Sequence, residues 1–307
     1  MNRKISEYKN ARHLLTFRSR KTKQKFPFFL VGMSFLIPIL LLLPGLIYMG
    51  IFPFGDLTTL TVDLRNQYVG FFEAMRNALQ DPGSLLYNFT KGLGGVMSGT
   101  VAYYLTSPLN LLIFLFPSKD LPMAIELIQL LKVGLAGAFF AIFLIKKEHG
   151  DSILVLLFSV PYALMGFVVA NLLNLMWLDP ILLLPLIILM LERMFDGKSA
   201  IPYILLLAWS ILTNFYAAYM LCLFLGLYAI WALIRRSGMH TRTRKAALKN
   251  AWHQFVYFGF SSLVAALLCA VILLPTGYSL MMSKGPYQDL IQYRWSNAYP
   301  WLDPLSR

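Results

Sequence analysis

Charged residues are scarce in this sequence, and that scarcity excludes most water-soluble folds. Only 13% of the 307 residues are charged, whereas 58% are hydrophobic, and the mean hydropathy is +0.63. An ordinary soluble domain carries roughly 25% charged residues, because its surface must be hydrated. The composition therefore predicts a protein that crosses a membrane several times.

Cysteine and histidine are also rare, which leaves little material for disulfide bonds or a zinc site. The two cysteines, Cys222 and Cys269, both fall inside apolar runs and are interpreted as small buried hydrophobic residues. The four histidines are irregularly spaced, and the sequence contains neither a phosphate-binding glycine loop nor a Gly-x-Ser-x-Gly elbow. A disulfide framework, a zinc enzyme and a serine hydrolase are therefore unsupported.

Acidic residues are about half as frequent as basic ones, 14 against 27, which gives a net charge of +13. Such an excess can indicate nucleic-acid binding. Here, however, the basic residues cluster in short segments between apolar runs, where anionic lipid headgroups are the simpler partner. We therefore predict membrane lipids, and no nucleic acid, as partners.

Long apolar runs are abundant. A membrane-spanning helix needs about 20 apolar residues, and seven runs are long enough. A further apolar stretch, residues 101–117, is both short and interrupted by Ser107, Pro108 and Asn110. We predict an all-α polytopic membrane bundle of about seven transmembrane helices, with 101–117 as a re-entrant or interfacial element. The seven predicted spans are 27–51, 122–145, 152–171, 176–194, 200–217, 218–234 and 252–275.

The distribution of basic residues predicts the orientation. If 101–117 does not cross, 19 of the 27 Lys and Arg residues fall on the side of the N-terminus, which the positive-inside rule makes cytoplasmic. The apolar run after Pro27 is too long for a cleavable signal peptide. The predicted parts are a cytoplasmic basic arm at 1–26, the transmembrane bundle at 27–275 with an outer loop at 52–121, and an extracellular tail at 276–307, where the chain stops as the front part of a longer protein would.

Polar residues begin the predicted outer helix TLTVDLRNQYVGFFEAMRN, residues 59–77. Its apolar spacing is typical of a helix that lies along the membrane interface, with Asp63 near its start. One interpretation makes Asp63 a cap or first-turn acid that offsets the helix dipole. The other makes it a reactive carboxylate at the membrane surface, beside Arg65 and Gln67. Residue type alone leaves both open.

Ionisable residues also occur inside the second predicted span. Glu126, Gln129 and Lys132 follow each other at i, i+3 spacing, so all three can face the interior of the bundle. Charged groups at this depth are costly and usually face a partner or a cavity. The alternatives are an internal structural ion pair and a polar cavity that holds a lipid headgroup.

Two outer turns carry further polar side chains. Asn174 and Asp179 accompany Trp177 in the segment 171–180, and Asn214 accompanies several tyrosines in the segment 212–220. Aromatic belts at the membrane interface explain the aromatic residues, but they do not explain the asparagines.

The order of several short motifs resembles one known family. DLRNQYVGFF, GLGG, YYLTSPLNLLIFLFP, MWLDPILLLPLIILMLERM and LTNFYAAYMLCLFLGLY together resemble the YfhO family of bacterial membrane proteins, over about the front third of a typical member. That family is similar in architecture to the GT-C glycosyltransferases and is associated with glycosylation of lipoteichoic acid in Gram-positive bacteria. The resemblance implies a GT-C-like bundle in the bacterial plasma membrane with an extracytoplasmic active face. It also implies a polyprenyl-phosphate-linked sugar donor and a teichoic acid or other envelope polymer as acceptor.

The resemblance also assigns roles to residues. GT-C enzymes place a catalytic aspartate in the first outer loop, which corresponds to Asp63 here, with Asp56 as the fallback. A carboxylate next to the acceptor hydroxyl acts as general base, and a cation stabilises the departing phosphate. The candidate substrate-binding residues are Arg65, Gln67, Glu126, Lys132, Asn174, Asp179, Asn214 and Arg294, of which Arg65, Lys132 and Arg294 are the alternatives for the lipid phosphate.

Other readings remain open at the level of sequence. No cofactor is predicted with certainty, and a divalent metal stays an alternative, because one aspartate with one acidic neighbour does not make a binding cage. A transporter or flippase for lipid-linked sugars would place polar groups through the bundle, and a non-catalytic assembly factor would use the outer loop only for docking.

Overall fold

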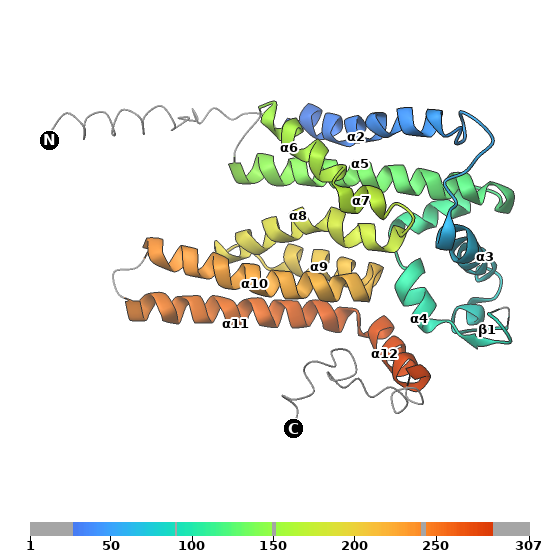
Figure 1. Ribbon diagram of the computed structural model, residues 1–307. Coiled ribbons are helices and arrows are strands. Elements are labelled where there is room, and N and C mark those ends of the chain that lie inside the picture. The colour runs from blue at the N-terminus through green and yellow to red at the C-terminus, as the bar shows by residue number, and fades with distance from the viewer. Residues whose placement is uncertain (1–26, 90, 149–151, 241–243, 285–307) are drawn as a thin grey trace, which may run out of the picture.

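The computed structural model describes residues 27–89, 91–148, 152–240 and 244–284, and helices dominate this part of the chain (Figure 1). Two short strands, β1 (Tyr87–Asn88) and β2 (Gly95–Val96), form an antiparallel hairpin. The predicted all-α membrane bundle is therefore confirmed as a fold class. The predicted arm at 1–26, most of the tail and Arg294 lie outside the described residues.

Five helices of the described residues are long and apolar enough to cross a membrane. Two of the predicted spans, 152–171 and 200–217, form shorter elements instead of single long helices. Helix α9 (Ile201–Thr213), for example, has 13 residues and is therefore only about 20 Å long, which falls short of the ~30 Å of hydrocarbon. The five long helices are α2 (Phe28–Tyr48), α5 (Leu121–Glu148), α8 (Leu175–Phe195), α10 (Phe215–His240) and α11 (Arg244–Leu268), and the shorter elements are α6 (Leu154–Ala163) with α7 (Gly166–Ala170), and α9 (Ile201–Thr213).

Local backbone conformation explains where the helices break. Met165 is extended, with ψ 150°, between α6 and α7, and Asn214 is extended, with φ −164° and ψ 108°, between α9 and α10. The predicted span 252–275 is displaced. Helix α11 starts earlier because the strong helix formers of the segment RKAALKN extend it, and a separate helix, α12 (Ala270–Lys284), follows it.

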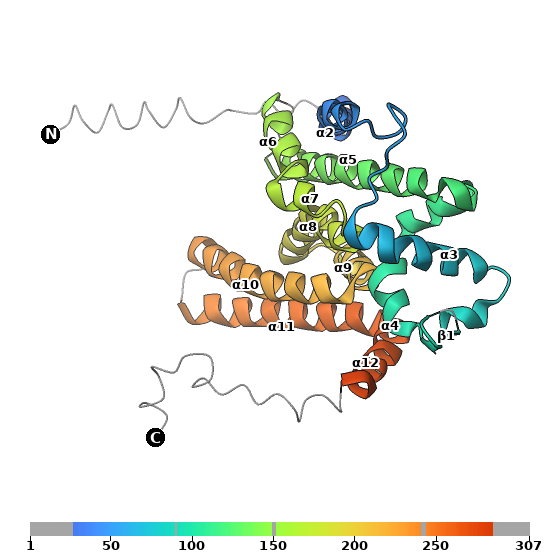
Figure 2. The same ribbon diagram turned by 45° about the vertical axis from the view of Figure 1, so that its right-hand side comes forward.

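The long helices lie side by side, with α5 packed against α2 and α6 on one side and against α8 on the other (Figure 1). Helix α11 packs against α9 and α10. Both views show α3 (Val69–Asn77) and α4 (Ser98–Thr100) gathered at one end of the bundle, where α12 turns away from α11 (Figures 1 and 2).

Helices α2 and α5 approach each other closely through small residues. A Cβ atom added at Gly137 would lie 2.1 Å from the carbonyl oxygen of Ser34, and one added at Gly134 would lie 2.7 Å from the ring of Phe35. Ser159 of α6 donates a hydrogen bond of 2.7 Å to the Ser34 hydroxyl. Such small-residue contacts are typical of helix packing in membranes, and here they fix α2 against two neighbours.

The outer loop forms short helical elements that cover the same end of the bundle. After Asp63 come a π-helical turn, η1 (Leu64–Tyr68), and α3, so the predicted helix exists. Leu64, Tyr68 and Phe72 are buried in one cluster with Ile125 of α5 and Met176 of α8. The loop is therefore held on the ends of two long helices by its own apolar face. The remaining short elements are η2 (Pro82–Leu85), η3 (Val101–Leu105), η4 (Pro108–Leu115) and η5 (Ser118–Asp120).

The ambiguous run 101–117 is broken, and it is not among the helices that could span a membrane. It divides into η3 and η4 at Ser107, which is extended and precedes Pro108. The Asn110 amide donates a 3.0 Å hydrogen bond to the Tyr104 carbonyl oxygen across the break. The Asn110 side chain thus provides a hydrogen bond to a backbone carbonyl oxygen that an uninterrupted helix would have paired with a backbone N–H group.

Candidate functional site

A hollow of about 1080 Å³ opens beside the outer loop, between the β-hairpin, η3, the start of α10 and α12. Its walls come from segments far apart in sequence, which meet because α12 folds back towards α4 at this end of the bundle (Figure 2). Aromatic side chains form much of the wall and offer flat apolar surface with polar edges. These are Tyr103, Tyr104, Phe215, Tyr216 and Tyr278.

Lys91 supplies the positive charge in this wall. Its ammonium group folds back to donate hydrogen bonds to the Val96 carbonyl oxygen, at 2.8 Å, and to the Thr100 hydroxyl, at 3.1 Å. The Ser98 hydroxyl also borders the hollow, is buried, and has no hydrogen-bond partner within the described part of the chain. A hollow lined by both a cation and an unpaired hydroxyl is suited to bind an anionic oxygen of a ligand.

The sequence interpretation missed Lys91 and Ser98 as site residues. The signal was the segment KGLGG, in which the glycines have a conformational role: Gly92 and Gly94 have φ values of +64° and +109°, which side-chain-bearing residues rarely adopt. These turns return the chain at β2 and let Lys91 reach Val96. The partners of Lys91 depend on this turn, so residue type alone could not reveal them.

Ring contacts hold the tyrosines of the hollow in place. The ring centroids of Tyr103 and Tyr104 are 4.8 Å apart, and Tyr104 also contacts Tyr68 at 5.1 Å and Phe71 at 4.8 Å. The Trp177 indole donates a 3.1 Å hydrogen bond to the Tyr103 hydroxyl. The part of the wall formed by Tyr103 and Tyr104 is therefore held in place by contacts within the protein.

Asp63 reaches this wall through two hydrogen bonds. The Gln67 amide nitrogen donates to Asp63 at 3.2 Å, and the Tyr104 hydroxyl donates to the Gln67 amide oxygen at 3.3 Å. Asp63 occupies the N-cap position of η1 but makes no capping hydrogen bond. Its carboxylate is exposed, and neither Asp63 nor Gln67 lines the hollow directly. Tyr104 connects the two parts of the candidate site.

The environment keeps Tyr104 protonated. Burial is the main cause that raises the pKa of Tyr104 above its usual value, and the neighbouring Tyr103 and the negative charge of Asp63 raise it further. The pKa of Tyr68 is raised as well, mainly by burial. Tyr104 therefore remains a hydrogen-bond donor to Gln67 across the physiological pH range.

Lys132 and Asp179, both predicted to bind substrate, are bound to each other. The Lys132 ammonium lies 2.5 Å from the Asp179 carboxylate and donates a second hydrogen bond of 2.8 Å to the Leu175 carbonyl oxygen. Ser107 donates to the other Asp179 oxygen at 2.9 Å. Both charges are buried. The partner of Lys132 is thus Asp179 rather than Glu126, and the pair ties α5, α8 and the broken run 101–117 together.

The predicted asparagines also have protein partners. Asn214, which is fully buried, donates to the Tyr103 carbonyl oxygen at 3.0 Å and accepts from the Ala217 backbone at 2.7 Å. It therefore caps the start of α10 and supports a residue of the hollow. Asn174 donates a 3.1 Å hydrogen bond to Asn171.

The remaining predicted site residues are dispersed. Asp56 and Arg65 are exposed and do not line the hollow, and Glu126 borders a different hollow next to α2. Arg294 lies outside the described residues. Across the described ranges, no group of three His, Cys, Asp or Glu side chains is placed to hold a metal ion.

Comparison with known proteins identifies the family. The family model described as bacterial membrane protein YfhO matches residues 34–307, so the chain belongs to this family and is a multi-pass membrane protein. No curated protein matches the chain, and no solved structure matches it.

Proposed function

We propose that this YfhO-family protein is a membrane glycosyltransferase. In this proposal it moves a sugar from a polyprenyl-phosphate carrier to an envelope polymer, such as lipoteichoic acid, at the extracytoplasmic face of the plasma membrane. The observation that carries the proposal is the hollow lined by tyrosines and Lys91, connected through Tyr104 and Gln67 to the exposed carboxylate of Asp63. Aromatic walls suit sugar rings and isoprenoid chains, and Lys91 suits a phosphate.

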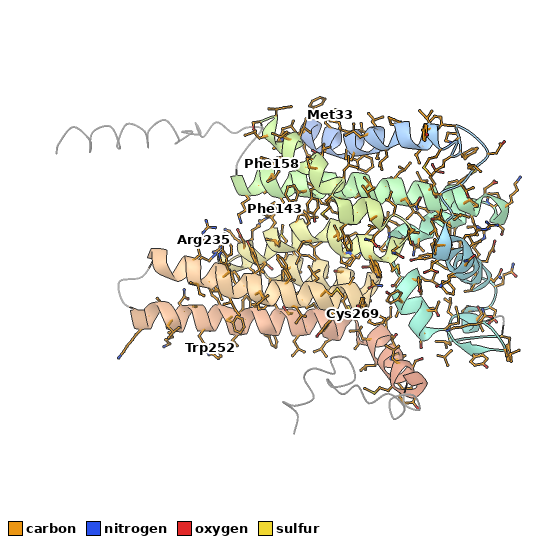
Figure 3. The ribbon with its side chains drawn as sticks, in the orientation of Figure 1. Met33, Phe143, Phe158, Arg235, Trp252 and Cys269 are labelled. Atoms are coloured by element: carbon orange, nitrogen blue, oxygen red, sulfur yellow. The ribbon has the colours of Figure 1, made fainter. Side chains whose placement is uncertain are left out.

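Charge at the two ends of the bundle supports the proposed orientation. The end opposite the hollow carries the basic residues at the termini of α5, α8, α10 and α11, and Arg235 marks this end in Figure 3. Basic residues concentrate on the cytoplasmic side of membrane proteins. The hollow and Asp63 are therefore assigned to the extracytoplasmic face. The basic residues are Lys146, Lys147, Arg193, Arg235, Arg236 and Lys245.

The proposed reaction is a single displacement at the anomeric carbon. Asp63 takes the proton of the acceptor hydroxyl as its oxygen attacks, and the bond between the anomeric carbon and the phosphate oxygen breaks. The leaving group is the polyprenyl phosphate, and the sugar configuration is inverted. Gln67 orients the Asp63 carboxylate by its hydrogen bond, which is the role of a positioning residue for a general base.

We assign the lipid phosphate to Lys91 and Ser98 rather than to Lys132. Lys132 is buried and already neutralises Asp179, and removing it from that pair would leave an unpaired charge inside the protein. Lys91 faces the hollow, and its bonds to Val96 and Thr100 are to neutral oxygens. Its positive charge is thus available to stabilise the charge that grows on the phosphate. Arg65 remains the alternative at this end.

The test is transfer of labelled sugar from polyprenyl-phosphate donors by the purified protein in liposomes. We expect Asp63→Asn to lower the rate at least ~100-fold, in line with loss of a general base, while Asp56→Asn serves as the matched control with an unchanged rate. Lys91→Met is expected to lower the rate by about tenfold or more through loss of a charged hydrogen bond to phosphate.

The outcomes separate the alternatives. A loss in Asp56→Asn with normal transfer in Asp63→Asn would move the base to Asp56. Unchanged transfer in both variants would contradict a carboxylate base in this loop. If the protein moves the lipid-linked sugar across the liposome membrane without transferring it, the protein is a transporter and the proposed activity is wrong.

A further inference from the structure

A second hollow of about 360 Å³ lies on the other side of the outer loop, between the end of α2, residues 58–61, α5 and the end of α7. We call it the Glu126 groove. It shares no lining residue with the hollow around Lys91. Its volume lies within the range of about 300–1,000 Å³ that is usual for small-ligand sites.

Two unpaired polar groups border the Glu126 groove. Glu126 is only 8% exposed, and within the described residues its carboxyl group makes no hydrogen bond and no ion pair. The Thr59 hydroxyl oxygen is also buried and has no hydrogen-bond partner in the same part of the chain. A buried polar group without a partner is costly. The Thr59 hydroxyl is fully enclosed, whereas the oxygens of Glu126 keep some accessible surface where this residue borders the groove. A ligand in the groove can therefore supply the partner that Glu126 lacks.

The walls show from which side such a ligand enters. Leu42 and Leu46 of α2 and Leu130 of α5 make the groove apolar. Met49, which follows α2, and Val169 of α7 also line the groove and are 59% and 43% exposed on the outer surface. Because this surface of a membrane protein faces lipid, the groove opens towards the acyl chains. The ligand is therefore a lipid.

The polar residues define the headgroup. Glu126 accepts hydrogen bonds, and the hydroxyl groups of Thr58, Thr59 and Thr61 both donate and accept them. The described residues that line the groove include no Lys, Arg or His. A lipid phosphate in the groove would therefore lie near the Glu126 carboxyl group with no cation to balance the two groups. This disfavours phospholipids, including those with an amine headgroup, because they carry a phosphate as well. A headgroup with several hydroxyl groups and no phosphate fits all four residues.

We propose that the Glu126 groove binds an uncharged glycolipid, whose sugar hydroxyl groups pair with Glu126 and with the threonines while its acyl chains follow α2 and α7. The site is separate from the proposed transfer site. Its occupancy does not depend on whether the protein transfers sugars.

Binding of defined lipids to the purified protein tests the proposal. Glycosyl diacylglycerol, diacylglycerol, phosphatidylglycerol and phosphatidylethanolamine with the same acyl chains are compared by native mass spectrometry and by the thermal unfolding midpoint. We expect the glycosyl lipid to bind most tightly. Glu126→Leu should weaken its binding about tenfold or more, and Thr59→Val about threefold, which are the losses of a charged and a neutral hydrogen bond.

Matched variants keep the test decisive. Glu73→Ala, an acid of α3 that does not line the groove, is the control and should bind like the unmodified protein. Should Glu126→Leu fail to fold, Thr59→Val and Glu126→Gln give the same comparison. Equal binding of phosphatidylglycerol, unchanged glycolipid binding in the groove variants, or no lipid binding at all would each overturn the proposal. None of these results depends on the transfer assay.

Discussion

Lys132 and Asp179 illustrate how a buried ion pair acts in this protein. The two charges are 2.5 Å apart, and the Lys132 and Asp179 side chains are 0% and 3% exposed, respectively. Desolvation makes a buried pair a weak source of stability, but the loss of one partner leaves a charge with nothing to neutralise it. The pair therefore specifies how α5, α8 and Ser107 meet.

We predict that Lys132→Met and Asp179→Leu each lower the free energy of unfolding by about 3–5 kcal/mol, because each leaves one buried charge unpaired. The double variant should lose much less than the sum of the two. Unfolding in detergent, followed by tryptophan fluorescence, measures this. Lys198→Met, at an exposed position, is the control, and additive losses would contradict the coupling.

The sequence did not show which residues the polar side chains of α5 contact. The spacing of Glu126, Gln129 and Lys132 predicted that they share a buried face, and all three are buried. The spacing did not show that Lys132 pairs with a residue of another helix, whereas Glu126 lines a groove with Thr59. Helical periodicity determines which face a residue occupies, but the partner comes from another element.

At the scale of the elements, the contact of α2 with α5 depends on the absence of a side chain at Gly137. The carbonyl oxygen of Ser34 occupies the place that a Cβ atom at Gly137 would need. Since the obstacle is backbone, a larger residue must separate the two helices.

We predict that Gly137→Ala lowers the free energy of unfolding by about 1–3 kcal/mol, the usual cost of overpacking. The matched control is Gly32→Ala on α2, where nothing lies within 4 Å of the added Cβ. The control should be neutral or stabilising by up to ~1 kcal/mol, because alanine favours helix more than glycine does. Thermal unfolding of the purified variants measures both, and equal midpoints would contradict the close contact.

The elements themselves were largely predictable. Runs of about 20 apolar residues identified α2, α5, α8 and α10. The serine–proline break made 101–117 ambiguous, and the distribution of Lys and Arg correctly removed that run from the spans. Apolar length could not place the start of α11, since its first residues are basic and helical by propensity. It also could not find the break at Cys269 that separates α12 from α11.

For the molecule as a whole, the two ends of the bundle differ in charge and in the structure that covers them. The outer loop covers one end, and most of the Lys and Arg residues that the structure describes lie at the other (Figures 1 and 3). The sequence predicted this asymmetry from the counts of Lys and Arg. It could not predict the hollow, because Lys91 and Tyr278 meet there only through the packing of α12.

We predict the orientation of the chain from this asymmetry. In a Cys222→Ala/Cys269→Ala background, a cysteine introduced as Gln80→Cys should react with a membrane-impermeant maleimide in intact cells. A cysteine introduced as Lys198→Cys should react only after the membrane is permeabilised. Both positions are exposed. The reverse labelling pattern would place Asp63 in the cytosol and would remove the proposed glycosyltransferase site.

The close approach of the Ser34 carbonyl group to Gly137 also fixes the position of α2 on α5. Phe35 and Ile39 lie against Gly134, and the Ser34 carbonyl oxygen and Pro38 lie against Gly137, so the close contact extends over more than one turn of α2. The contact is centred in the first half of α2, and Met49 follows the last residue of this helix at the border of the Glu126 groove. Beyond α2 the chain passes through the buried Ile51 into the loop that carries Asp63, so the contact with α5 also anchors the start of that loop to the bundle.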